Sequence, residues 1–247
     1  MDVVNSTNEF AAELLAKENK IYEGTIILAN SQTAGKGQRG NTWESHYGKN
    51  LTFSIILFPV FLKINQPFML NKAISLAVND FIESIFHHSS LITHHSIKWP
   101  NDIYVGSCKI AGILIENAYL GNTFKHSIIG MGININQETF SSNIPNPISL
   151  KMLTGKDYNI EGLLSELEIC IQKRYHQLKS GDFTNIDQDY LNSIYKYGIS
   201  SEYIYRGEKI TAHITGIDPT GSLILLNEDT GEIIKSEFKE IVFTHNS

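Results

Sequence analysis

Apolar residues in the first half of the chain recur with the spacing of helices and of strands in turn. A helix is predicted to begin at Ser6, because Ser6 and Glu9 have the spacing of a capping box and apolar residues follow at helical intervals. A second helix is predicted from Pro67 to about Ile85, where apolar positions again have helical spacing. Apolar runs predict five strands, at residues 25–29, 51–58, 96–105, 109–116 and 127–135.

The pattern changes after residue 136. Residues 137–147 predict a loop, and residues 160–178 form an amphipathic helical pattern with Gly181 as its stop. One further helix is predicted at residues 187–197. From about Ser200 onward, short apolar runs are separated by turn signals, which is typical of a small β-barrel-like module. These changes in pattern predict two domains, over residues 1–196 and 197–247.

The composition is that of a soluble globular protein, with 42% hydrophobic and 19% charged residues. Twenty Lys and Arg against 26 Asp and Glu give a net charge of −6, which argues against a dedicated nucleic-acid-binding protein. Cys108 and Cys170 are too few for a disulfide framework and favour a reducing cytosol. The start does not resemble a signal peptide, and no apolar run approaches the roughly 18–20 residues of a membrane span, so secretion and membrane insertion are not expected.

The segment Gly35-Lys36-Gly37-Gln38-Arg39-Gly40 matches the pattern G-x-G-x-x-G. A dinucleotide-binding loop requires a helix directly after it and an acidic residue about 20 positions later, and the sequence predicts neither. A P-loop is also excluded, because Asn41-Thr42 replaces the Lys-Ser/Thr pair. The glycines and the charges of Lys36 and Arg39 suit an anion such as phosphate, although a solvated surface loop explains the segment equally well.

Lys98-Trp99-Pro100-Asn101-Asp102 interrupts an apolar run. Because proline is disfavoured inside a sheet, pairing is expected to bend or end there, exposing Asn101 and Asp102 at a strand end, where α/β sheets bind ligands. A tight turn at Gly106-Ser107 would then bring Asp102 close to Lys109. The two residues predict either a shared site or an ordinary surface ion pair in a plain hairpin.

Gly130-Met131-Gly132-Ile133-Asn134 ends another apolar run. The glycines permit the close approach of a planar ligand, and the amide of Asn134 can both donate to and accept from a base edge. A glycine-rich strand end without a ligand is the alternative.

In this order, the segments resemble the catalytic domain of biotin protein ligases. The matching residues are Ser6-Thr7-Asn8, Gln32 with Gly35-Lys36-Gly37 and Trp43, Lys98 to Asp102, Lys109 with Gly112 to Glu116, and Gly130 to Asn134. The β-rich tail is similar to the small SH3-like domain of that family. The resemblance implies an α/β fold (α+β type), with a mixed-sheet biotin/lipoate ligase-like catalytic domain followed by a small SH3-like β-barrel domain.

The resemblance also implies which residues contact each ligand. Biotin is expected to contact Ser6, Thr7, Asn8, Gln32, Gly35, Lys36, Gly37, Gln38, Lys109 and Gly112. ATP is expected to contact Arg39, Gly40, Trp43, Asn101, Lys109 and Asn134. The expected catalytic residues are Lys109, Arg39, Lys36 and Asp102, and Asp102 is the candidate ligand of Mg²⁺.

The implied activity is ATP-dependent activation of biotin to biotinyl-5′-AMP, followed by transfer of biotin to a lysine of a biotin carboxyl carrier domain in the cytoplasm. Lys109, Lys36, Arg39 and Mg²⁺ would neutralise the charge that builds on the phosphoryl oxygens. The nearest alternative is a lipoate–protein ligase. An alternative of another class is a non-catalytic biotin- or nucleotide-binding module, against which the presence of Lys109 and Asp102 argues.

Two features depart from the family pattern. Many members have arginine at the position of Gln38. We expect Arg39 beside it to take over the role of that arginine in retaining the adenylate. The Ser6 motif stands so close to the start that an N-terminal DNA-binding domain has no room, so we expect a monofunctional ligase with no DNA or membrane partner. A homodimer is left open, and the segment after Ser200 is expected to close over the nucleotide.

Overall fold

The computed structural model describes residues 1–18, 20–87 and 94–244. Its centre is a sheet built from β2 (Thr25–Leu28), β4 (Leu51–Leu57), β5 (His95–Lys98), β6 (Asp102–Val105), β7 (Cys108–Leu120) and β8 (Thr123–Ile133). The strands stand in the order β2-β4-β8-β7-β6-β5, and each neighbouring pair is antiparallel. Among the strands described, the parallel pairing expected of a mixed sheet is confined to a separate small sheet of β1 (Val3–Val4) and β3 (Ser31–Gln32).

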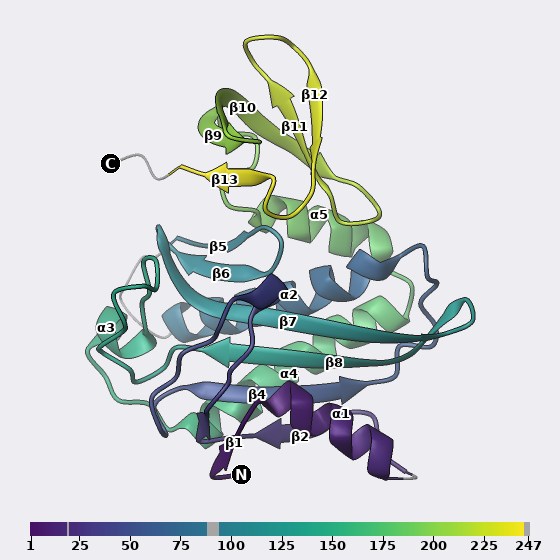
Figure 1. Ribbon diagram of the computed structural model, residues 1–247, viewed down its shortest axis with the longest axis vertical. Helices are drawn as coiled ribbons and strands as arrows, with labels where there is room; N and C mark the ends of the chain where they lie inside the picture. The colour runs from purple at the N-terminus through teal and green to yellow at the C-terminus, as the bar shows by residue number, and fades with distance from the viewer. Residues whose placement is uncertain (19, 88–93, 245–247) are drawn as a thin grey trace.

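Helices α2 (Pro67–His87) and α4 (Ile160–Lys179) lie behind the large sheet in Figure 1, and α5 (Phe183–Ser193) lies above its edge strand β5. Most of α2 is buried, which explains why its sequence is apolar on more than one side. Arg174 on α4 joins the three helices. Its guanidinium donates to both carboxylate oxygens of Asp80 on α2, at 2.7 and 3.0 Å, and to Asp189 on α5 at 2.6 Å.

The opposite face of the sheet carries less structure. Helix α1 (Thr7–Lys17) lies in front of the sheet in Figure 1, where Ala11 packs with residues of β2, β4 and β8 in a second, smaller apolar cluster. The segment after β3 crosses the same face. An antiparallel sheet can leave one face partly uncovered, and the remaining space on this face holds the candidate site.

Several local predictions need correction. The capping box is wrong: α1 follows Ser6 as expected, but the Ser6 side chain makes no capping bond. The run at 96–105 is two strands, because residues 99–101 form a turn between β5 and β6. The helix expected at 187–197 begins earlier and ends at Ser193, since the following residues bond to β5, with the Tyr195 N–H donating to the carbonyl of Ile97 at 2.9 Å. A short helix, α3 (Leu150–Thr154), was not predicted.

The final strands form a separate antiparallel sheet, called here the C-terminal sheet. Its strands are β9 (Ser201–Tyr205), β10 (Glu208–Ile217), β11 (Leu223–Asn227), β12 (Ile233–Ser236) and β13 (Ile241–Phe243), in the order β12-β11-β10-β9-β13. The C-terminal sheet contacts the β5–β6 turn through Trp99, because Trp99 Nε1 donates a hydrogen bond to the Gly221 carbonyl at 2.9 Å. Only glycine fits at that point, since a Cβ on Gly221 would overlap the ring of Phe68 on α2. The predicted α+β fold class is confirmed. In the described part of the chain, no helix is long and apolar enough to cross a membrane.

Candidate active site

Glycines on neighbouring strands leave a strip of bare backbone on the open face of the large sheet. Gly132 on β8 stands opposite Gly112 on β7, and Gly130 lies two residues away on the same face. The row continues with Thr52 on β4 at one end and Asp102 on β6 at the other. The row therefore carries side chains at its ends and none in its middle, and forms a floor on which a flat group can lie. The site lies on this face, and Asn101 and Asp102 reach it from the start of β6, the strand end that the sequence predicted.

The cavity above this glycine floor is called here the inner pocket. It is enclosed by the start of α1, by β3, by the glycine loop and by strands of the large sheet. Predicted site residues that line it are Ser6, Thr7, Asn8, Gln32, Lys36, Gly37, Gln38, Trp43, Asn101, Asp102, Lys109 and Gly112. The fold thus brings together segments as far apart in the sequence as Ser6 and Gly112.

One end of the inner pocket is a network of polar side chains, called here the polar corner. Gln32 Oε1 accepts from the Thr7 backbone N–H at 2.7 Å and from the Thr7 hydroxyl at 3.1 Å. Ser54 Oγ lies 2.7 Å from Thr7 Oγ1 and 2.6 Å from Asn8 Oδ1. Asn8 Nδ2 donates to Glu116 Oε2 at 2.7 Å. Amide and hydroxyl groups fixed in this way suit a small polar head group.

The indole of Trp43 lies on the glycine floor. A Cβ on Gly132 would overlap the indole ring, and one on Gly112 would stand 3.3 Å from Trp43 Cζ3. Trp43 Nε1 is buried and has no hydrogen-bond partner among the described residues. A buried donor without a partner is costly, so a ligand that accepts this N–H would gain from it. With the indole in this position, the inner pocket has a volume of about 90 Å³.

Lys109 and Asp102 form an ion pair at the edge of the glycine floor. Lys109 Nζ lies 2.7 Å from Asp102 Oδ1, and the two side chains are 26% and 28% exposed. The pair stands on the β6–β7 hairpin, whose turn falls at Gly106-Ser107 as predicted. Lys109 Nζ also lies 5.9 Å from the centroid of the Trp43 ring. Both charged residues line the inner pocket and a second cavity beside it.

The second cavity, called here the outer cleft, has a volume of about 760 Å³, which is within the range of small-molecule sites. Its wall includes the loop at 140–147 and residues of the C-terminal sheet. Lys98 Nζ lies 4.8 Å from the centroid of the Tyr104 ring and 5.3 Å from that of Phe243. Burial lowers the pKa of Lys98, and the nearby carboxylate of Asp102 opposes that effect.

The glycine loop forms a narrow hairpin over the inner pocket. Lys36 pairs with Thr42 in an antiparallel bridge, and the Trp43 N–H donates to the Gly35 carbonyl at 2.9 Å. A 3₁₀ turn, η1 (Gln38–Gly40), forms the tip. This geometry fixes where Trp43 enters the site.

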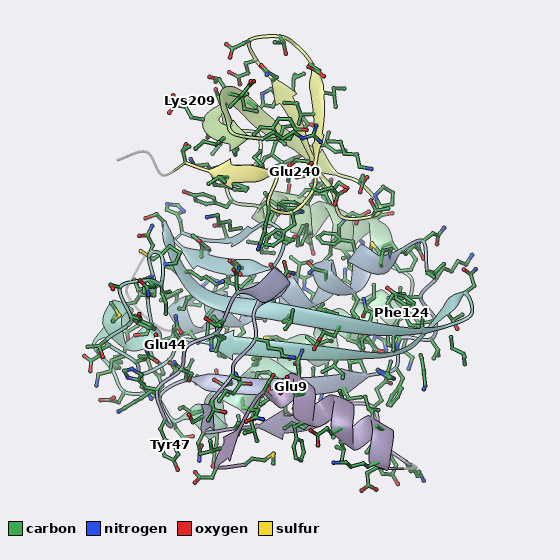
Figure 2. The ribbon with its side chains drawn as sticks, viewed as in Figure 1. Glu9, Glu44, Tyr47, Phe124, Lys209 and Glu240 are labelled. Atoms are coloured by element: carbon green, nitrogen blue, oxygen red, sulfur yellow. The ribbon has the colours of Figure 1, made fainter. Side chains whose placement is uncertain are left out.

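A charged contact ties the hairpin to α1. Lys36 Nζ lies 2.7 Å from Glu9 Oε1, and that hydrogen bond raises the pKa of Lys36. Glu9, labelled in Figure 2, lies in front of the large sheet. The side chain of Arg39 is outside the described part of the structure, so its predicted role stays a prediction.

The remaining predicted residues differ in which cavity they reach. Gly40 and Asn134 line the outer cleft, and the Asn134 amide donates to the Ile148 carbonyl at 3.0 Å. Asn101, expected at ATP, lines the inner pocket and donates its amide to the Ile113 carbonyl. Gly35 lines neither cavity, because it packs against the backbone of Trp43.

Sequence reasoning assigned no site role to three residues that the fold places at the site, although Lys98 belongs to a motif that it singled out. Ser54 and Thr52 are two buried polar residues in the apolar run of β4, and polar residues in such a run were the available signal. Lys98 and Phe238 line the outer cleft, and Phe238 lines the inner pocket as well. Nothing in the local sequence marks Phe238, because a phenylalanine beside a turn is common in any small β module.

The fold and the site define an α+β protein with two joined cavities and a lysine–aspartate pair between them, an arrangement suited to bringing two anionic ligands together. Residues 1–134 match the family described as Biotin/lipoate A/B protein ligase family. The Bifunctional ligase/repressor BirA of Bacillus subtilis (strain 168) is 32% identical over 241 residues, covering 95% of this chain and 70% of that protein. The chain belongs to the biotin/lipoate A/B protein ligase family, as the resemblance of its motifs predicted.

A solved structure and a further relative agree with this family assignment. Biotin protein ligase from Aquifex aeolicus in complex with biotin and ATP superposes with a TM-score of 0.78 at 26% identity, covering 99% of this chain and 97% of that chain. The Biotin--[acetyl-CoA-carboxylase] ligase of Paracoccus denitrificans is 27% identical over 233 residues, or 90% of each chain.

Proposed function

We propose that this chain is an ATP-dependent biotin protein ligase. It makes biotinyl-5′-AMP from biotin and ATP and transfers biotin to a lysine of a biotin carboxyl carrier domain. The observation that carries the proposal is the position of the Lys109–Asp102 pair, which lines both the inner pocket and the outer cleft. A carboxylate held in one cavity and a triphosphate held in the other would meet at this pair.

Biotin occupies the inner pocket in this proposal. The polar corner, with Ser6, Thr7, Asn8 and Gln32, holds its polar ring, and the rest of the molecule lies along Gly112 and Gly132 once the Trp43 indole moves off the glycine floor. The biotin carboxylate then points toward Lys109. ATP lies in the outer cleft, where Gly40 and Asn134 line the wall and Trp43 offers its ring to the base.

In the first step, a carboxylate oxygen of biotin attacks the α-phosphorus of ATP, the bond to the bridging oxygen breaks, and pyrophosphate leaves. Negative charge grows on the phosphoryl oxygens, and Lys109, Lys36 and Arg39 stabilise it. Mg²⁺ typically uses one or two protein carboxylates together with substrate phosphates. Asp102 at the junction and Glu44 in the outer cleft fit that donor chemistry, and the ion would supply further neutralisation of phosphate charge.

In the second step, the acceptor lysine loses a proton, its amine attacks the acyl carbon of biotinyl-AMP, an amide forms and AMP leaves.

A cytoplasmic reaction fits the use of ATP and the free thiols of Cys108 and Cys170. Residues 197–247 form the second domain in this proposal, because β9–β13 build a sheet of their own. A homodimer is tested by light scattering on the same sample.

The experiment is mass spectrometry of a carrier domain after incubation with the chain, Mg·ATP and either biotin or lipoate. We expect one biotinyl group per carrier with biotin, no change with lipoate, and no change without ATP. Transfer of lipoate instead of biotin would favour the lipoate–protein ligase alternative. Binding of biotin without any transfer or adenylate formation would favour the non-catalytic alternative.

A further inference from the structure

Phe238 is a residue of the C-terminal sheet region that reaches the junction of the two cavities. It lines both the inner pocket and the outer cleft, as do Trp43, Asp102 and Lys109. Those three residues belong to the first half of the chain, whereas Phe238 follows β12 in the turn that leads to β13. The junction is therefore completed by a side chain from about 130 residues farther along the sequence than Lys109.

The turn that carries Phe238 is held by bonds on both of its sides. The Glu240 N–H donates to the Glu237 carbonyl at 3.1 Å, and the Glu237 N–H donates to Glu240 Oε2 at 2.8 Å. Arg206 pairs with the other Glu240 oxygen at 2.8 Å, and Ser222 Oγ donates to Glu237 Oε1 at 2.6 Å. Figure 2 shows Glu240 where the C-terminal sheet approaches the large sheet. A turn fixed in this way presents the intervening side chain in one position.

The ring of Phe238 also has a fixed neighbour on the other side. Its centroid lies 6.1 Å from that of Trp99, in an edge-to-face arrangement. Trp99 is itself held by its bond to the Gly221 carbonyl. The phenyl ring thus contacts an indole of fixed position, is carried by a turn held by hydrogen bonds, and lines both cavities.

We propose that Phe238 is the apolar wall that keeps water from the acyl-phosphate bond at the junction of the two cavities. This inference rests on the proposed function. A mixed anhydride is lost when water attacks its acyl carbon, which releases biotin and AMP without transfer. An enclosed, apolar surround suppresses that side reaction. Trp43 supplies such a surface from the glycine loop, and Phe238 supplies a second one from the C-terminal sheet.

The test measures AMP released per biotin transferred in the full chain, with biotin, Mg·ATP and a carrier domain. In Phe238→Ala we expect this ratio to rise about five- to tenfold, because one aromatic contact surface is lost. Phe238→Leu keeps an apolar side chain and should bring the ratio most of the way back. Tyr205→Ala is the matched control: Tyr205 is also partly buried against the core of the C-terminal sheet but lines neither cavity.

Each outcome decides the inference. A ratio within twofold of wild type in folded Phe238→Ala would overturn it, and so would an equal rise in Tyr205→Ala, which would indicate general loosening. If Phe238→Ala does not fold, Phe238→Tyr replaces it: a hydroxyl placed in the wall must raise the ratio, and an unchanged ratio overturns the inference. A wild-type chain that forms no biotinyl-AMP would instead overturn the proposed function itself.

Discussion

Replacing Lys109 with glutamine removes the ammonium at the cavity junction while keeping a long polar side chain. At the observed 2.7 Å from Asp102, Coulomb attraction at an effective dielectric constant of about 20 is about 6 kcal/mol before desolvation. Most of that attraction is offset by the cost of removing two charges from water, so we expect the free energy of unfolding to fall by only about 1 kcal/mol. The catalytic loss is expected to be much larger, because removing one preorganised group from developing charge typically costs about 10²–10³ in rate.

The assay is single-turnover formation of biotinyl-AMP from α-labelled ATP at saturating biotin, together with thermal unfolding of each variant. Lys125→Gln is the control, because Lys125 is an exposed lysine on β8 that lines neither cavity. Lys125→Gln should match wild type in both measurements. An adenylation rate within tenfold of wild type in folded Lys109→Gln would refute the role assigned to this lysine.

Three further predictions concern recognition and stability. Gly130→Ala places a Cβ where Asn8 Oδ1 now lies and should raise KM for biotin at least about tenfold by breaking the polar corner, whereas Gly216→Ala, whose Cβ would meet only Ile224 at 4.0 Å, should leave KM unchanged. Arg174→Met leaves the carboxylate of Asp80 unpaired among the helices and should lower the free energy of unfolding in urea by about 3 kcal/mol; full recovery in Arg174→Lys would contradict the importance of the forked geometry. Burial acts to raise the pKa of Asp218, but hydrogen bonds from Lys235, Thr220 and Ser222 hold it well below its usual value. Asp218→Asn should therefore cost about 1–3 kcal/mol at pH 7. The extra free energy of unfolding of wild type over Asp218→Asn is fully present above the unfolded pKa of about 3.9 and is lost as the pH falls toward the lower folded pKa. An equal difference in free energy of unfolding at pH 7 and at pH 2, measured by denaturant titration, would count against this reasoning.

Local patterns in the sequence determined most elements of the fold. Apolar spacing located α1, α2, α4 and the strands of the two larger sheets, with β5 and β6 as one run, but not β1 or β3, because the periods of helices and strands depend on neighbours in the chain. Errors arose where distant contacts outweighed local preference. The helix α5 ends at Ser193, before its predicted stop, because the next residues pair with β5.

The chemistry of the site was also readable in part. The residue types of the glycine loop suited an anion, and those of Asp102 and Lys109 suited a shared site or a surface ion pair; the family followed from the order of the motifs. The glycines at 130 and 132 permitted the close approach of a planar ligand, which stays a prediction; that the Trp43 indole lies against Gly132 was not foreseen.

Only the tertiary structure decided how these parts meet. The register of β4, β8, β7 and β6 aligns Thr52, Gly132, Gly112 and Asp102 in one row, and a shift of one residue would turn each side chain to the other face. That register depends on pairing between segments far apart in the chain, which local spacing does not encode. The same holds for Phe238, whose position at the cavity junction results from the docking of the C-terminal sheet on Trp99.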